Sequence, residues 1–229
     1  VGNLKALKGI DERNLSLQKQ NLMLARRIEE STKNLSRLYE DLRETYMRTI
    51  KALAHAIDAR DHYTYSHSDN VARYAEVVAL AMKVDPQVLA DIKDACQLHD
   101  LGKIGVQDSI LSKPSALTRE EFDQIKLHAV KGAQILEPLN FMPNVIDIIK
   151  HHHERWDGKG YPDGLKGEMV PLGARIMTVA DSYDAMVSAR PYRRIGMTKK
   201  AAVDEITKNS GAQFDPKVVD AFLKVVDRF

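Results

Sequence analysis

The sequence predicts an all-α protein, in which a long N-terminal coiled-coil helix precedes a helical bundle domain. Residues 1 to about 45 contain no proline and no glycine after Gly9, and they are rich in Leu, Lys, Arg, Glu and Asn, which suits one long helix. Further along the chain, helical segments follow one another between short turns, and no convincing strand pattern alternates with them. With 229 residues, of which 44% are hydrophobic and 29% charged, the chain can bury one sizeable core and still carry an extended appendage.

The composition excludes several classes of protein. Lys and Arg total 34 against 32 Asp and Glu, so the chain lacks the basic surface of a protein that binds nucleic acid polymers. Its single cysteine, Cys96, cannot form an intramolecular disulfide, and we find neither a membrane segment nor a secretory signal. We therefore expect a cytoplasmic protein. Because the first residue is Val, we expect the chain to be the end portion of a longer protein with an upstream sensor or receiver domain.

The long helix carries a heptad pattern over more than five heptads. The a positions are Leu7, Asn14, Asn21, Ile28, Leu35 and Leu42, and the d positions are Ile10, Leu17, Leu24, Ser31, Leu38 and Thr45. Asparagines at a positions lower stability, but they pair across a parallel two-stranded coil and so specify its register. We predict a parallel homodimer. The alternative is a single amphipathic helix lying on its own domain, because the polar a and d residues weaken the seam.

The rest of the chain is predicted to form one globular domain. We place the coiled-coil or linker helix at residues 1–49 and the domain at 50–229, with the first helix continuing to Ile57 and breaking near Asp61. Further helices are predicted at about 67–83, 87–101, 118–136, 143–153, 174–189, 198–210 and 216–227. The glycine-rich stretch from Glu154 to Pro171 is expected to be an ordered functional loop.

Histidines and acidic residues occur in patterns that suit metal binding. His99 and Asp100 stand together at the end of an apolar helix, followed by Lys103. Neighbouring residues diverge by about 100° on a helix, so this pair can serve two neighbouring ions or opposite sides of one ion, and a bridging carboxylate fits this geometry. For this pair alone, ligand and structural roles are equally open.

A second pair of adjacent histidines, His152 and His153, repeats the arrangement on another predicted helix. Asp181 lies on an apolar helix, where an unpaired carboxylate would be costly, so a cation is expected beside it. Other residues have a plainer interpretation. We expect hydrogen-bonded structural histidines at 55, 62 and 151, and a small core residue at Cys96.

Taken together, these residues match a known pattern. Residues 50 to 229 resemble the HD-GYP group of the HD phosphohydrolase superfamily. The motifs that carry the resemblance are, in chain order, His67-Ser68, His99-Asp100-Leu101-Gly102-Lys103, His128, His152-His153-Glu154, Gly158-Lys159-Gly160-Tyr161-Pro162, Val179-Ala180-Asp181 and Arg190-Pro191-Tyr192-Arg193. The resemblance implies an HD-type helical bundle and a bacterial metal-dependent phosphodiesterase that hydrolyses cyclic di-GMP to linear pGpG, and it leaves open a second step to GMP.

The resemblance also implies two divalent metal ions and a hydroxide nucleophile that they activate. One ion would be held by His67, His99, Asp100 and Asp181, and the other by Asp100, His128, His152 and His153, so that Asp100 bridges them. Mixed imidazole and carboxylate ligands suit Fe or Mn, and also Zn or Ni, better than Mg or Ca. The family favours Fe or Mn.

The remaining roles concern the substrate. Lys103, near Asp100, is expected to bind a non-bridging phosphate oxygen, and Asp184 to orient a ligand, water or leaving group. Tyr161 would shape the pocket wall. Arg190 and Arg193 correspond to positions that hold the second phosphate in the family, although an ordinary solvated surface is the alternative for both.

Two further alternatives stay open. Some family members have a Glu that completes a third metal site where this chain has Tyr63, so we expect two metals, unless Asp58 or Asp61 contributes. The domain could also be a non-catalytic module that binds a cyclic dinucleotide or a partner protein. A third possibility is an HD enzyme that acts on another nucleotide.

Overall fold

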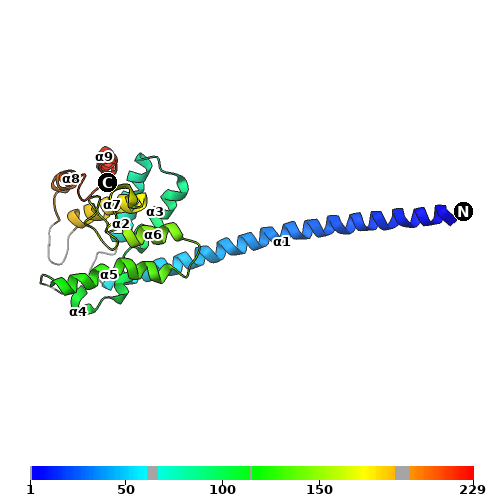
Figure 1. Ribbon diagram of the computed structural model, residues 1–229, viewed down its shortest axis with the longest axis horizontal. Helices are drawn as coiled ribbons and strands as arrows, with labels where there is room; N and C mark the ends of the chain where they lie inside the picture. The colour runs from blue at the N-terminus through cyan, green and yellow to red at the C-terminus, as the bar shows by residue number, and fades with distance from the viewer. Residues whose placement is uncertain (1, 61–66, 114, 189–195) are drawn as a thin grey trace. The chain divides into compact units, whose positions relative to one another are not determined.

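The computed structural model describes residues 2–60, 67–113, 115–188 and 196–229, with side chains from residue 8 onward (Figure 1). These residues form α-helices and short 3-10 helices, and no β-strand is found in the described ranges, where an isolated bridge joins Ser210 and Phe214. The prediction of an all-α protein is confirmed. None of the described helices combines the length and the apolar run that crossing a bilayer requires.

The first helix, α1(Gly2–Arg60), is continuous, but the contacts divide the chain into two compact units, Val1–Thr49 and Ile50–Phe229. In the first unit, the apolar heptad residues from Ile10 to Leu42 are exposed. Ile28, for example, leaves 59% of its surface in solvent. A lone helix cannot bury such a seam by itself, and the predicted dimer stays a prediction.

The second unit contains the remaining helices. They are α2(His67–Ala81), α3(Pro86–Leu98), η1(Leu101–Gly105), α4(Asp108–Leu111), α5(Arg119–Leu136), α6(Pro143–His151), η2(Gly167–Met169), α7(Leu172–Val187), α8(Lys199–Lys208), α9(Pro216–Val225) and η3(Val226–Arg228). Most begin within two residues of the predicted positions. The predicted C-terminal ends of two helices were wrong, because α3 stops before His99 and Asp100 and α6 stops before His152 and His153. The one-turn helix α4 was not predicted.

Side-chain caps explain where several helices begin. The Asp85 carboxylate accepts a hydrogen bond from the backbone N–H of Gln87 at the start of α3 (2.8 Å). Thr118 and Glu121 form a reciprocal capping box at the start of α5. Proline occupies the first turn of α3, α6 and α9, where no intrahelical donor is lost.

The core of the second unit lies around α7, which packs against α2, α3, α6, α8 and α9 (Figure 1). Gly173 permits the approach of α6, because a β-carbon there would overlap the side chain of Ile148. Near the other end of α7, the Tyr183 ring packs against the rings of Tyr74 and Phe222 at 5.2 and 5.4 Å. This packing fixes the helix that carries Asp181 and Asp184.

A second close approach joins η1 to α5. A β-carbon at Gly102 would overlap the carbonyl oxygen of His128 and the backbone nitrogen of Gly132. Only glycine lets these two backbones meet. The contact therefore fixes the segment around Asp100 relative to His128.

We expect the Gly102→Ala substitution to lower the free energy of unfolding by about 2 to 3 kcal/mol, because the added methyl group overpacks a backbone contact that cannot move aside. Gly105→Ala is the matched control in the same 3-10 helix. Its methyl group would meet only the flexible side chain of Lys131, so its cost should stay below about 1 kcal/mol. Urea unfolding of both variants measures the difference, and equal stabilities would contradict the packing argument.

Candidate metal centre

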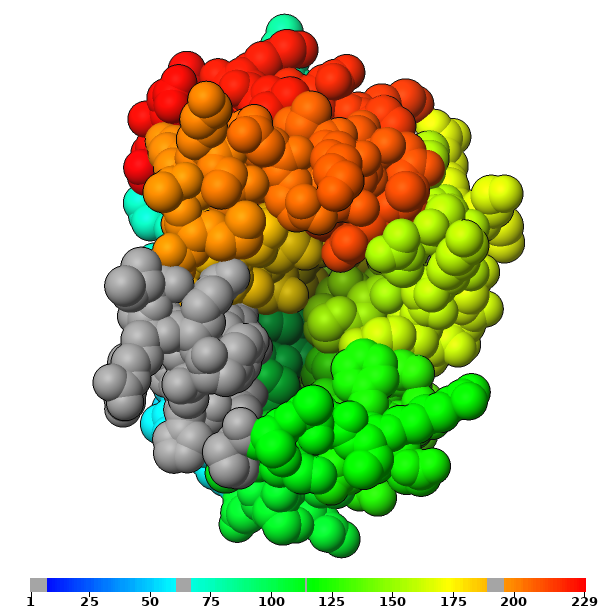
Figure 2. All heavy atoms as spheres, turned by 90° about the vertical axis from the view of Figure 1, so that its left-hand side faces the viewer, coloured from blue at the N-terminus to red at the C-terminus, as the bar shows by residue number. Residues whose placement is uncertain are grey.

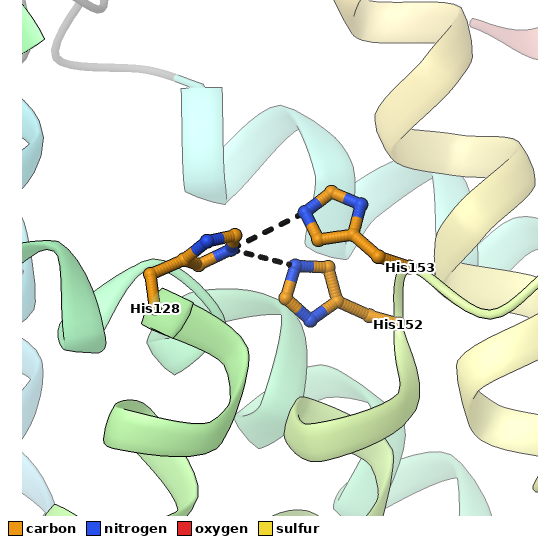
Figure 3. A group of neighbouring side chains, drawn as sticks. All are labelled: His128, His152 and His153. Atoms are coloured by element: carbon orange, nitrogen blue, oxygen red, sulfur yellow. Dashed lines mark hydrogen bonds between the residues drawn. The ribbon is translucent and has the colours of Figure 1, made fainter. Parts of the chain in front are cut away.

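Two groups of side chains, all buried except the half-buried His153, bring potential metal ligands together. The first is His67, His99 and Asp100, and the second is His128, His152 and His153, which Figure 3 shows. Within each group, the ligand atoms lie within 4.8 Å of one another. The six residues come from α2, the turn after α3, α5 and the end of α6. Segments far apart in the sequence thus build one site.

Hydrogen bonds to the backbone orient three of the imidazole rings. Nδ1 of His99 lies 2.8 Å from the carbonyl oxygen of Cys96. Nδ1 of His128 lies 2.6 Å from the carbonyl oxygen of Ile125, and Nδ1 of His152 lies 2.6 Å from that of Ile149. A carbonyl oxygen can only accept, so Nδ1 carries the proton in each ring. The Nε2 lone pair of each ring is then left for a ligand.

The Nε2 atoms of the three histidines converge in the second group. Nε2 of His128 lies 3.3 Å from Nε2 of His152 and 3.2 Å from Nε2 of His153 (Figure 3). Burial lowers the pKa of His128, takes that of His152 well below its ordinary value, and lowers that of His153 to about 3. Nitrogen ligands about 2.1 Å from one metal ion lie roughly 3.0 to 3.4 Å apart, which matches these two distances. The donor set fits a metal ion.

Asp100 lies between the two groups. Its Oδ1 is 3.7 Å from Nε2 of His128, and its Oδ2 is 3.5 Å from Nε2 of His99 and accepts a hydrogen bond from Lys103 at 2.8 Å. Burial by itself would raise the pKa of Asp100, but Lys103 and the surrounding histidines outweigh it and hold the pKa well below its usual range. An ionised carboxylate that faces both groups has the geometry of a bridging ligand.

His67 contacts a carboxylate through each ring nitrogen. Nε2 lies 3.3 Å from Oδ1 of Asp181, and Nδ1 lies 2.7 Å from Oδ2 of Asp184. Burial would lower the pKa of His67, but the two carboxylates overcome this effect and raise it to about 10. Asp181 therefore stands on the ligand side of the ring. Asp184, with a side chain only 2% exposed, stands behind it and positions the ring.

The two predicted helices that were to carry the ligand pairs end earlier than expected. His99 caps α3, and Asp100 has left helical geometry at φ −90° and ψ 2°, which brings its carboxylate close to the His99 ring. His152 caps α6, and the backbone N–H of Glu154 donates to the carbonyl of His151 across the following turn. The ligand pairs thus occupy turns, where neighbouring side chains can point to a common centre.

The glycine-rich loop after α6 lies beside the second group. The Tyr161 ring packs on the His153 ring with centroids 4.8 Å apart and planes tilted by 30°. Glu154 is a functional residue that its sequence position alone did not predict. Its buried Oε1 accepts hydrogen bonds from the backbone N–H groups of Asp163 (2.7 Å) and Gly164 (2.9 Å), which holds the loop. A carboxylate between paired histidines and a glycine-rich loop is the signal that could have suggested this role.

Not every residue named from the sequence contributes to the site. His151 points elsewhere and contacts Asp163 (Nε2 to Oδ2, 3.0 Å), so it is a structural histidine as expected. Asp58 accepts a hydrogen bond from the Ser68 hydroxyl and belongs to neither ligand group. The residues Asp61, His62, Tyr63, Arg190 and Arg193 lie outside the described part of the chain.

Comparisons with known proteins agree with this site. The chain is 38% identical over 228 residues to the cyclic di-GMP phosphodiesterase response regulator RpfG of Xanthomonas campestris pv. campestris, covering 95% of this chain and 60% of the relative. It is 39% identical over 212 residues to a cyclic di-GMP phosphodiesterase of Thermotoga maritima, covering 92% of this chain and 55% of the relative. The chain therefore spans only about 60% or less of these relatives.

A solved structure shares the fold. A cyclic GMP-AMP specific phosphodiesterase of Vibrio cholerae superposes with a TM-score of 0.58 at 20% identity, covering 78% of this chain and 48% of that chain. The model of a protein family described as HD domain matches residues 51–218, which include both ligand groups. These findings confirm the resemblance drawn from the sequence motifs. The chain belongs to the HD domain family.

Proposed function

We propose that this chain is the catalytic part of a metal-dependent phosphodiesterase that hydrolyses cyclic di-GMP to linear pGpG and then, in part, to GMP. The observation that carries the proposal is the pair of neighbouring ligand groups, with the ionised Asp100 carboxylate 3.5 Å from Nε2 of His99 in one group and 3.7 Å from Nε2 of His128 in the other. The two curated relatives described above act on this substrate according to their names. Residues 1–49 would be the coiled-coil linker and residues 50–229 the catalytic domain.

The proposed metal ligands are the seven side chains expected from the sequence. One divalent ion would be held by His67, His99, Asp100 and Asp181, and the other by Asp100, His128, His152 and His153. Imidazole nitrogens mixed with carboxylate oxygens favour Fe or Mn over Mg or Ca. When bound, the two cations would lower the pKa of a water molecule and offset the negative charge of the phosphodiester.

The protein's own groups have distinct proposed roles. The buried ammonium of Lys103, 2.8 Å from Asp100, would donate to a non-bridging phosphate oxygen of the substrate. Asp184 would hold the His67 ring in its ligand orientation, so its role is positioning rather than contact with the substrate. Tyr161 would form the pocket wall beside His153. Arg190 and Arg193 remain the predicted holders of the second phosphate.

We expect the chain, reconstituted anaerobically with Fe(II) or Mn(II), to convert cyclic di-GMP to pGpG. Chromatography of the products measures this conversion. Asp100→Ala should abolish turnover. His152→Gln should lower activity by more than about 100-fold, because it removes a proposed ligand. His151→Gln is the matched control one residue earlier, outside the site, and should keep activity close to that of the unaltered chain. Equal losses in the two histidine variants would argue against the site.

Asp184→Asn should weaken metal binding by about 10-fold to 100-fold, because the His67 ring loses the carboxylate that orients it. Competition with a chelator measures this affinity directly. Asp147→Asn is the control, since a carboxylate oxygen of Asp147 lies 2.9 Å from Nδ1 of the structural His151, as that of Asp184 lies beside Nδ1 of His67. An unchanged affinity of Asp184→Asn for the metal would show that Asp184 does not position the His67 ring.

A second candidate substrate is another cyclic dinucleotide. The fold itself does not decide between substrates, because a cyclic GMP-AMP specific phosphodiesterase shares it. Parallel assays with cyclic di-GMP, cyclic GMP-AMP and cyclic di-AMP would rank the three by kcat/KM.

The exposed heptad seam supports a parallel homodimer through α1, which would carry signals from an upstream sensor or receiver domain. We expect Ile28→Lys, at an a position, to shift the full chain toward the monomer in sedimentation equilibrium. Leu22→Lys is the matched control, because Leu22 is equally exposed (58%, against 59% for Ile28) but lies off the seam. A monomeric unaltered chain, or equal shifts in both variants, would exclude this interface.

A further inference from the structure

A row of side chains leads away from the candidate metal centre along α5. Tyr161 packs on His153, and the Nζ atom of Lys126 lies 5.8 Å from the centre of the Tyr161 ring. The same Nζ atom lies 4.8 Å from the centre of the Phe122 ring. One cation is therefore held between two aromatic rings, and the first ring touches a proposed metal ligand.

This row borders an accessible surface. Phe122 leaves 44% of its surface in solvent, and the Lys126 side chain is 33% exposed. Figure 2 shows a hollow at the centre of one face of the second unit, with green atoms below it and yellow-green atoms to its right. An exposed aromatic ring can stack on a flat ligand.

A carboxylate completes the row. Asp123 accepts a hydrogen bond from Lys126 at 2.7 Å, and its side chain is 55% exposed. The hydrogen bond from Lys126 holds the pKa of Asp123 below its usual range, so the carboxylate is ionised. This part of α5 therefore presents a donor and an acceptor side by side, next to an aromatic ring.

These groups complement a guanine base. Guanine offers a π-face for stacking, two acceptors at O6 and N7 that lysine recognises, and donors at N1 and N2 that a carboxylate can accept from. Adenine has neither O6 nor a proton on N1. We propose that Phe122, Asp123 and Lys126, beside Tyr161, form the subsite for one guanine base of the cyclic dinucleotide. This inference rests on the proposed function and adds the residues that select the base.

The alternative interpretation is an ordinary surface ion pair between residues three apart on a helix. Such a pair contributes little, and helix geometry already places Lys126 beside Phe122, four residues earlier, but it does not account for the contact with Tyr161 on another segment. The position of Lys126 over both Tyr161 and Phe122, continuous with the proposed metal ligand His153, favours the subsite.

Steady-state kinetics of the Mn(II)-loaded full chain tests the subsite. We expect Phe122→Ala to raise KM for cyclic di-GMP about tenfold with little change in kcat, because stacking holds the base and not the reacting phosphate. Phe122→Tyr keeps the ring and should restore KM. Asp123→Asn should lower the preference for cyclic di-GMP over cyclic di-AMP about tenfold. Leu127→Ala, at an exposed residue of the same helix outside the row, is the control.

The outcomes separate the two proposals. If the unaltered chain hydrolyses cyclic di-GMP and the Phe122 and Asp123 variants keep its KM and base preference, the subsite is wrong and the proposed function stands. An equal fall of kcat in Phe122→Ala and Phe122→Tyr would likewise overturn the subsite, because it would indicate a structural role. If the unaltered chain hydrolyses no cyclic dinucleotide, the proposed function fails and the subsite fails with it.

Discussion

The site depends on hydrogen bonds between imidazole Nδ1 atoms and the carbonyl three residues earlier. The last carbonyls of a helix have no intrahelical partner. The carbonyls of Cys96 and Ile149 are in the final turns of α3 and α6, and the rings of His99 and His152 bind them. At these two positions one hydrogen bond both satisfies a terminal carbonyl and orients a proposed ligand. The His128 ring binds the carbonyl of Ile125 in the same way inside the continuous helix α5, so the bond orients a ring with or without a helix end.

The second requirement is that the ligand-bearing turns keep their spacing. The backbone contact at Gly102 joins the turn that carries Asp100 to the middle of α5, where His128 lies. The packing of α7 against five neighbouring helices fixes Asp181 and Asp184 around His67. Buried charges at the centre are tolerated because each has a partner of opposite charge or a hydrogen-bond donor.

Much of this arrangement could be predicted from the sequence, and the exceptions have physical reasons. Helix starts were predictable because proline and capping residues mark them, as at Pro86 and Thr118. The ends of α3 and α6 were not, because a histidine that caps a carbonyl leaves no compositional signal. A four-residue helix such as α4 is too short to show periodicity. The contact between Asp184 and His67 joins residues far apart in sequence, so only the folded chain reveals which side of the ring each carboxylate occupies.

The helix α5 carries both His128 and Phe122, and this has a consequence for substrate choice. The two residues are six positions apart, which corresponds to a rise of about 9 Å along a stiff helix. The separation between the proposed metal centre and the proposed base subsite is thus set by helix geometry and not by a loop that could adjust. The protein would therefore select nucleotides by the distance between the phosphate and the base, in addition to any hydrogen bond that identifies the base.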